Sequence, residues 1–156
     1  MSVRWKEHFN CRIYVPQLHN KDYVLLMQAT RMEKIMEEKD LDYAKEMVKI
    51  AVAALEDKKG EDIRVIDISD VTVIADYFVI ATGSNINQVQ ALVDNVQEAL
   101  FKAGHETSKI EGYHTGAWVL LDYNHIIIHV FSKEDRLFYD LEKIWKNGKT
   151  VDVADL

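Results

Sequence analysis

The sequence predicts an α/β fold in which helices flank a mixed β-sheet. Segments with strand patterns alternate with segments of helical periodicity, and a hairpin followed by one more helix completes the pattern. This order is typical of a mixed sheet in one α/β domain. With 156 residues, 48% of them hydrophobic, the chain is long enough to bury one core.

The first helix is predicted to begin at Leu41. Apolar residues repeat from there at helical spacing, Asp40 can cap the start, and Gly60 follows the end. In residues 63–68 the side chains then alternate between two faces, as they do in a strand. The next strand, residues 76–82, is apolar on both faces, so we expect it in the middle of the sheet, with helices covering each side.

A second helix is predicted after Gly83 and Ser84. Asn85 can cap its start, Gln88 can complete a capping box, and Gly104 closes it.

The last part of the chain predicts a short strand near residues 108–111, then a hairpin and a final helix. The hairpin joins residues 117–123 to residues 126–131 through a two-residue link, although that link lacks the usual glycine. Ser132 can cap the final helix, which ends before Gly148. Its predicted buried face is made of Leu137, Phe138, Leu141, Ile144 and Trp145.

We divide the chain into an N-terminal extension of residues 1–35, a domain of residues 36–148 and a C-terminal tail of residues 149–156. The extension carries six basic and three acidic groups, unlike the acidic remainder, and includes a possible strand, Arg12–Val15. This extension can be a mobile segment or a non-native start of the chain. Met32 and Met36 are alternative natural starts, so the role of the extension stays open.

Composition excludes several classes of protein. The longest apolar runs are far below the roughly 18 residues of a membrane span. The single cysteine, Cys11, permits neither an internal disulfide nor a Cys-built zinc site, and the start lacks a secretory signal, so a cytoplasmic protein is expected. The formal charge of −7 disfavours extensive direct contact with nucleic acid.

The turn at Gly83 and Ser84 is the one local feature that suggests a nucleotide. It lies between a buried strand and a helix start, where an anion can bind. Neither the multiple-glycine dinucleotide fingerprint nor a lysine-bearing phosphate loop is present. An ordinary capped turn and a nucleotide-binding or nucleotidyltransferase-like enzyme therefore both remain open, with the first preferred.

Other catalytic patterns are missing from the sequence. Phosphoryl transfer with metal ions needs clustered carboxylates, but Asp122 stands alone among apolar residues. His125 and His129 are four residues apart on a strand, roughly 13 Å, which is too far to share one metal ion. We therefore predict a protein that is not an enzyme, with no catalytic residue, metal site or cofactor.

The segment EGYHTGAWVLLDY, residues 111–123, has the character of a binding surface. Trp118 and Tyr123 are residue types enriched at the centres of interfaces, and acids beside them can meet arginine or lysine on a partner. Core packing is the alternative for Trp118, and composition alone does not decide between the two.

Four segments in order resemble the ribosomal silencing factor family, also called the Iojap family: DYFVIATGS, a Gln-rich helix, EGY…WVLLDY and HVF…R…FYDLEKIW. The resemblance covers roughly Leu41 to Lys146. The residues that match the family's pattern are Gly83, Glu111, Gly112, Trp118, Asp122, His129, Arg136, Tyr139, Leu141, Glu142 and Trp145.

The resemblance implies a nucleotidyltransferase-like fold without the catalytic carboxylates. It also implies a repressor that binds the fourteenth protein of the large ribosomal subunit and sterically blocks association with the small subunit, lowering translation when nutrients are scarce. Trp118, Asp122 and Tyr123 match the family's binding positions. Family members are often homodimers when free.

One departure from the family lies between the last two predicted strands. Asn124 and His125 stand where the family usually has glycine and an acid. Loss of the acid can weaken contact with a basic partner, or His125 can make binding sensitive to pH.

Overall fold

The computed structural model describes the backbone of residues 20–156 and the side chains of residues 29–36 and 39–156. The chain divides into two units, residues 1–38 and residues 39–156, and the second contains the sheet. The expected strand Arg12–Val15 and the cysteine Cys11 lie outside the described residues.

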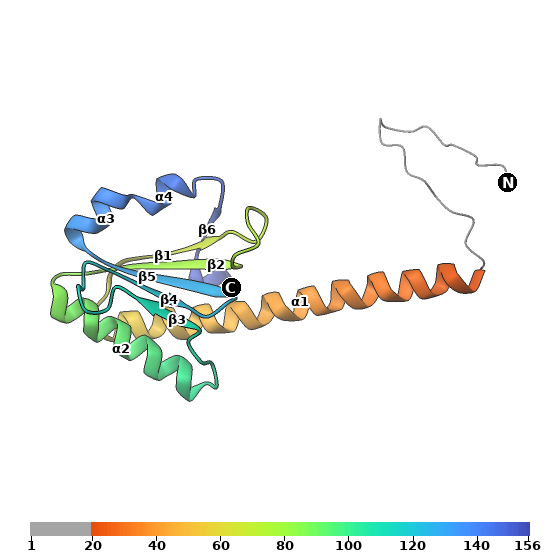
Figure 1. The fold of residues 1–156 in the computed structure, drawn as a ribbon, viewed down its shortest axis with the longest axis horizontal. Coiled ribbons are helices and arrows are strands. Elements are labelled where there is room, and N and C mark those ends of the chain that lie inside the picture. Colours follow the sequence, from red (N-terminus) through yellow and green to blue (C-terminus); the bar gives the residue numbers. More distant parts are fainter. Residues whose placement is uncertain (1–19) are drawn as a thin grey trace. The chain divides into compact units, whose positions relative to one another are not determined.

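The second unit is an α/β domain with a six-stranded mixed sheet, as predicted (Figure 1). The strand order is β3-β4-β5-β2-β1-β6; β2 and β5 are parallel, and every other neighbouring pair is antiparallel. The elements are α1 (Asn20–Asp57), β1 (Glu61–Asp67), β2 (Tyr77–Gly83), α2 (Ile86–Lys102), β3 (Lys109–Glu111), β4 (Trp118–Asp122), β5 (Ile126–Ser132), α3 (Lys133–Tyr139), α4 (Leu141–Ile144), β6 (Lys149–Val151) and the 3-10 helix η1 (Val153–Asp155).

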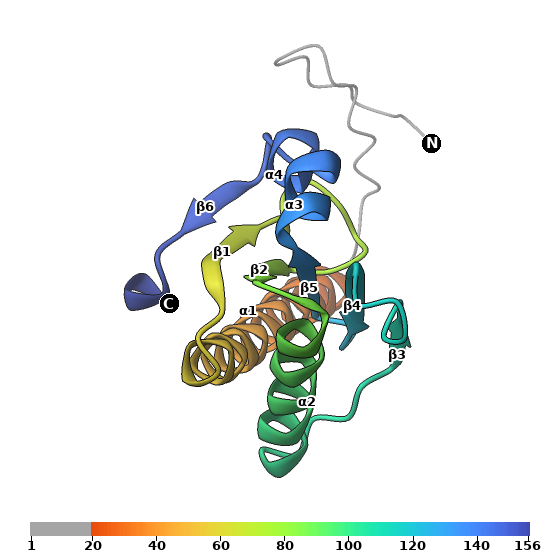
Figure 2. The ribbon, with the colours of Figure 1, turned by 90° about the vertical axis from the view of Figure 1, so that its left-hand side faces the viewer.

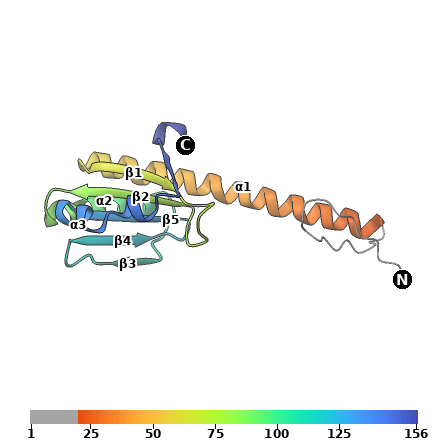
Figure 3. The same ribbon diagram turned by 90° about the horizontal axis from the view of Figure 1, so that it is seen from above.

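Helices cover both faces of this sheet. The part of α1 from residue 39 onward and α2 lie on one face, and α3 and α4 lie on the other (Figures 1 and 2). Every residue of β2 is buried, which confirms its predicted place in the middle of the sheet. Figure 3 shows β3 and β4 side by side at one edge, beyond the cover of α3.

The first helix starts earlier than predicted. Asp40 lies inside α1 and does not cap it, because the helix is continuous from Asn20 to Asp57. No glycine or proline interrupts this stretch, and residues such as Leu, Met, Ala, Glu and Lys favour helix throughout. A capping residue within a run of good helix formers is therefore not a reliable start.

The final helix is broken in two, which the periodicity did not reveal. Asp140 separates α3 from α4 in the left-handed conformation, with φ of 42°. The break turns Leu137, Phe138 and Ile144 outward, so their predicted burial was wrong. Leu141 is buried as predicted, and Trp145 packs against the same core.

The hairpin and the caps of α2 and α3 formed as predicted, except that Gln88 accepts from the backbone N–H of Ser84, the residue before the cap, and so does not complete the capping box with Asn85. Tyr123 donates its backbone N–H to the carbonyl of Ile126, and Asn124 at the turn has φ of 66°. Asn85 and Ser132 cap α2 and α3 through their side chains.

Residues 149–156 include β6, which pairs with β1 at the second edge of the sheet, and η1. Among the helices in the described part of the chain, none is both long and apolar enough to cross a membrane.

Candidate interaction surface

The candidate surface is built around β4, whose side chains alternate between the two faces of the sheet. Trp118 and Asp122 lie on the face that carries α3 and α4, roughly 13 Å apart along the strand. Tyr123 belongs to the core on the opposite face. The structure therefore brings two of the three sequence-derived residues onto one face and separates the third.

Trp118 is half-buried in a group of aromatic side chains. Its ring stacks on Phe131 with 5.1 Å between centroids, and Tyr139 of α3 lies 4.7 Å away on a tilted plane. The indole N–H donates to Nδ1 of His129 at 3.1 Å. Trp118 is thus packed against the core and also partly exposed, so its geometry is compatible with both alternatives.

His129 fixes the polar side of the indole. Burial, reinforced by the nearby Arg136 guanidinium, lowers the pKa of His129 to about 4. The neutral imidazole accepts the indole hydrogen bond at Nδ1, so its proton is on Nε2, which is buried and has no hydrogen-bond partner in the described structure. Trp118 is therefore held in one orientation by stacking and by a hydrogen bond.

Asp122 and Tyr123 have different surroundings at the end of β4. Asp122 is half-buried, and its Oδ1 accepts the backbone N–H of Asn124 at 2.8 Å, which supports the hairpin turn. Tyr123 is only 3% exposed, and its hydroxyl accepts a hydrogen bond from Thr107 at 2.9 Å. Burial raises the pKa of Tyr123. A partner on the surface can reach Asp122 directly but not the ring of Tyr123.

Arg136 is a site residue whose role the sequence reading missed. Its guanidinium is buried and binds the Glu142 carboxylate, with Nε at 2.9 Å from Oε1 and Nη2 also in contact. It also reaches Oδ2 of Asp62 at 3.2 Å and Oγ1 of Thr82 at 3.1 Å. Arg136 thereby ties α3 and α4 to β1 and β2. The predicted buried face of the final helix placed Arg136 on the outer side, so no local signal pointed to its burial or to its partner 74 positions away.

The turn at Gly83 and Ser84 is filled by the protein itself. Gln88 Oε1 accepts from the backbone N–H of Ser84 at 2.7 Å and from its hydroxyl at 2.6 Å. A Cβ on Gly83 would lie 2.7 Å from Cγ2 of Val89 and 2.9 Å from its backbone nitrogen. Glycine is thus needed here for close packing of α2.

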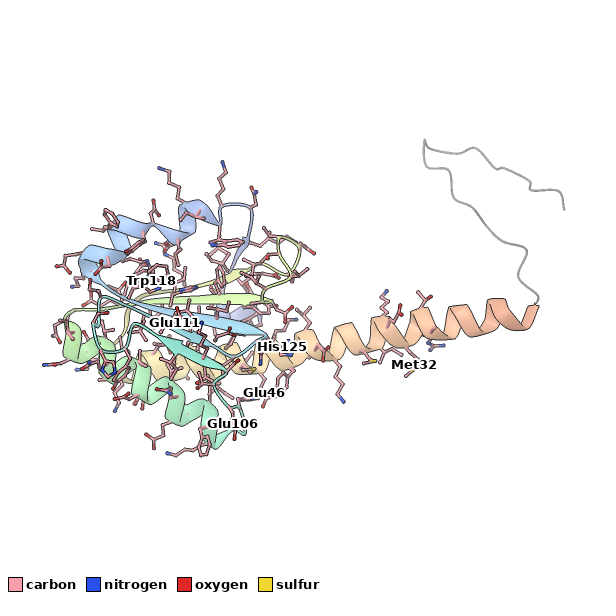
Figure 4. The ribbon with its side chains drawn as sticks, in the orientation of Figure 1. Met32, Glu46, Glu106, Glu111, Trp118 and His125 are labelled. Atoms are coloured by element: carbon pink, nitrogen blue, oxygen red, sulfur yellow. The ribbon has the colours of Figure 1, made fainter. Side chains whose placement is uncertain are left out.

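His125 lies at the hairpin turn, away from Trp118. Figure 4 shows the two residues at opposite ends of β4 and β5. The Nδ1 atom of His125 lies 3.0 Å from Oδ2 of Asp76, and its ring meets the edge of Tyr43 with 5.6 Å between centroids. Its closest described contacts are therefore within the domain. Among the described residues, no three His, Cys, Asp or Glu side chains are arranged to hold a metal ion.

Fold and site together define an α/β protein with an ordered, half-exposed tryptophan on a sheet face that α3 and α4 leave partly open. Comparison with known proteins identifies its relatives. The family described as "Ribosomal silencing factor during starvation" matches residues 41–156. The chain belongs to the ribosomal silencing factor family, a family of translation regulators that associate with the ribosome, as the resemblance predicted.

Relatives and solved structures agree with this assignment. Ribosomal silencing factor RsfS of Bacillus subtilis is 38% identical over 109 residues, covering 70% of this chain and 92% of that protein. Mouse "Mitochondrial assembly of ribosomal large subunit protein 1" is 30% identical over 105 residues, covering 65% of this chain and 46% of its own length. A crystal structure from Chromobacterium violaceum matches with a TM-score of 0.64 at 38% identity, covering 69% of this chain and 88% of the other.

Proposed function

We propose that this protein binds the large ribosomal subunit and sterically blocks its association with the small subunit, repressing translation under nutrient limitation. Membership of the silencing factor family is the observation that carries the proposal. The name of the mouse relative ties that protein to the large subunit, which supports the choice of subunit. The proposed contact is the fourteenth protein of that subunit.

The proposed binding site is the β4 surface with Trp118 at its centre. An aromatic side chain that is held in place but still half-exposed can enter a partner's pocket without losing much rotational freedom. Asp122 is available to meet a basic group on the partner, because ribosomal proteins present many such groups to RNA. Tyr123 lies on the opposite face, where its hydrogen bond with Thr107 helps to hold the end of β4 in place.

We infer further that the protein is not an enzyme. The alternative, a nucleotide-binding enzyme that uses the Gly83 turn, is not favoured because Gln88 occupies the polar groups of Ser84 that would meet a phosphate. In the same proposal the protein is cytoplasmic. It also forms a homodimer when free, and analytical ultracentrifugation at several concentrations tests this self-association.

Sedimentation with purified ribosomal subunits tests the proposal. The protein should cosediment with large subunits alone, and excess protein should reduce the formation of whole ribosomes from mixed subunits. Trp118→Ala should weaken binding by about 2 kcal/mol or more, a hot-spot-sized loss. Phe101→Ala is the matched control, because Phe101 is an exposed aromatic residue on α2.

Two results would overturn the proposal. One is the absence of cosedimentation by wild-type protein at micromolar concentrations. The other is saturable nucleotide binding with metal-dependent turnover that Gly83 substitution abolishes, which would revive the enzyme alternative. Circular dichroism melting of each variant shows whether a loss of binding comes from a loss of folding.

A further inference from the structure

The outer side of α3 exposes large apolar side chains that the fold leaves without cover. Leu137 is 84% exposed, Phe138 is 79% exposed, and Tyr139 is 40% exposed. Single exposed apolar residues are ordinary on a protein surface, but three consecutive large ones are not. We call these three residues the α3 rim.

The α3 rim is joined to the proposed Trp118 site by ring contacts. Phe138 meets Tyr139 edge to face with 5.1 Å between centroids, and Tyr139 lies 4.7 Å from Trp118. The aromatic row therefore runs from the exposed rim to the half-buried tryptophan of β4. A partner that covers Trp118 from the side of α3 also reaches the rim.

The exposure of the rim is built into the backbone. Ser132 caps α3 by accepting the N–H of Asp135, and the left-handed Asp140 ends the helix. Arg136 faces inward and holds Glu142, so α3 cannot rotate to bury Leu137 and Phe138 without breaking that buried pair. The rim is thus presented in a fixed orientation, which lowers the entropy lost on binding.

Charge indicates the kind of partner. Residues 39–156 carry 21 acidic and 13 basic residues, so this domain repels a phosphate backbone at long range and attracts a basic protein surface. Glu134 on α3 and Asp140 just after it flank the rim, are exposed, and form no ion pair among the described residues. Lys143 and Lys146 lie farther along, in and after α4. Carboxylates next to exposed rings favour a protein that offers apolar side chains beside arginine or lysine.

We propose that the α3 rim is a second part of the docking surface and receives a basic protein partner through its apolar side chains. This inference rests on the proposed function, since the partner is the one that covers Trp118. Leu137 and Phe138 insert between apolar groups of the partner, while Glu134 and Asp140 meet its cations. Tyr139 links the two parts of the surface.

Quantitative binding of the full-length protein to salt-washed large ribosomal subunits tests the rim. The variant Leu137→Ala/Phe138→Ala should weaken binding at least tenfold, because burial of two large apolar side chains is lost. Phe101→Ala, which removes an exposed ring of the same kind from α2, should bind within about twofold of wild type. Both variants should melt like wild type, since the replaced side chains are largely exposed.

Each outcome separates this inference from the proposed function. If wild type fails to bind large subunits, the proposed function is wrong. If wild type binds, Trp118→Ala weakens binding and the double variant binds like wild type, the rim proposal alone is wrong. A double variant that loses self-association in ultracentrifugation but keeps subunit binding would assign the rim to a second copy of this chain and also overturn it.

Discussion

The indole N–H of Trp118 donates to Nδ1 of His129 at 3.1 Å across the β4–β5 pair, so this half-buried residue is positioned by a buried imidazole. The bond needs His129 neutral, because a protonated imidazole offers no acceptor. Burial keeps it neutral by lowering its pKa to about 4. The orientation of Trp118 is therefore linked to the protonation state of His129.

His129→Gln should reduce the loss of stability at acidic pH. The folded-state pKa of His129 lies below the value of about 6.5 expected when unfolded, so its contribution is fully present above pH 6.5 and is lost as pH falls toward 4. At pH 5 the loss is roughly 2 kcal/mol. Glutamine does not titrate and can still accept the indole hydrogen bond.

Urea unfolding of both proteins at pH 7.5 and pH 5 measures this difference. Carboxylates that titrate in the same range are common to both proteins and cancel in the comparison. An equal drop in the free energy of unfolding for wild type and variant would mean that His129 is not the responsible group.

Arg136→Met should destabilise the domain by roughly 2 to 3 kcal/mol, because it leaves Glu142 half-buried without its partner. Arg64→Met is the matched control: Arg64 also binds Asp62, but both side chains are about half exposed, so the expected cost is below about 1 kcal/mol. Chemical denaturation gives both values. Similar costs for the two variants would contradict the buried role of Arg136.

Local signals explain most of what the sequence predicted correctly. The two-sided apolar run in β2 and the caps at Asn85 and Ser132 depend only on neighbouring residues, and each formed as expected. The break at Asp140 was missed because a left-handed aspartate has no distinctive local pattern. The helical periodicity of the apolar residues therefore predicted one continuous helix across Asp140, where the chain in fact turns.

The site was predictable only in part, for a related reason. Trp118 and Asp122 share a face by the two-residue period of a strand, and the same period puts Tyr123 on the other face. The contacts of Arg136 with Asp62 and of Trp118 with His129 depend on which strands become neighbours. Strand order is a property of the whole fold, which no single segment encodes.

Gly83→Ala should cost about 1 to 3 kcal/mol in stability. The added methyl group would meet the backbone nitrogen of Val89 at 2.9 Å, and backbone cannot rotate away as a side chain can. Ser84→Ala is the control, because it removes only an exposed hydroxyl, which donates to Gln88 and accepts from the Asn85 side chain. Thermal melting compares them, and a Gly83→Ala protein as stable as Ser84→Ala would show that α2 moves outward freely.

His125→Ala should weaken large-subunit binding by less than about threefold, the size expected for the loss of one partly exposed pair. The Nδ1 atom of His125 lies 3.0 Å from Oδ2 of Asp76, and its ring meets Tyr43, so the side chain supports the hairpin that follows the binding strand from within the domain. Asp76→Asn, which keeps a hydrogen-bonding side chain at that position, is the matched control and should bind like wild type. A tenfold or larger loss of binding by His125→Ala would mean that the hairpin turn contacts the partner directly.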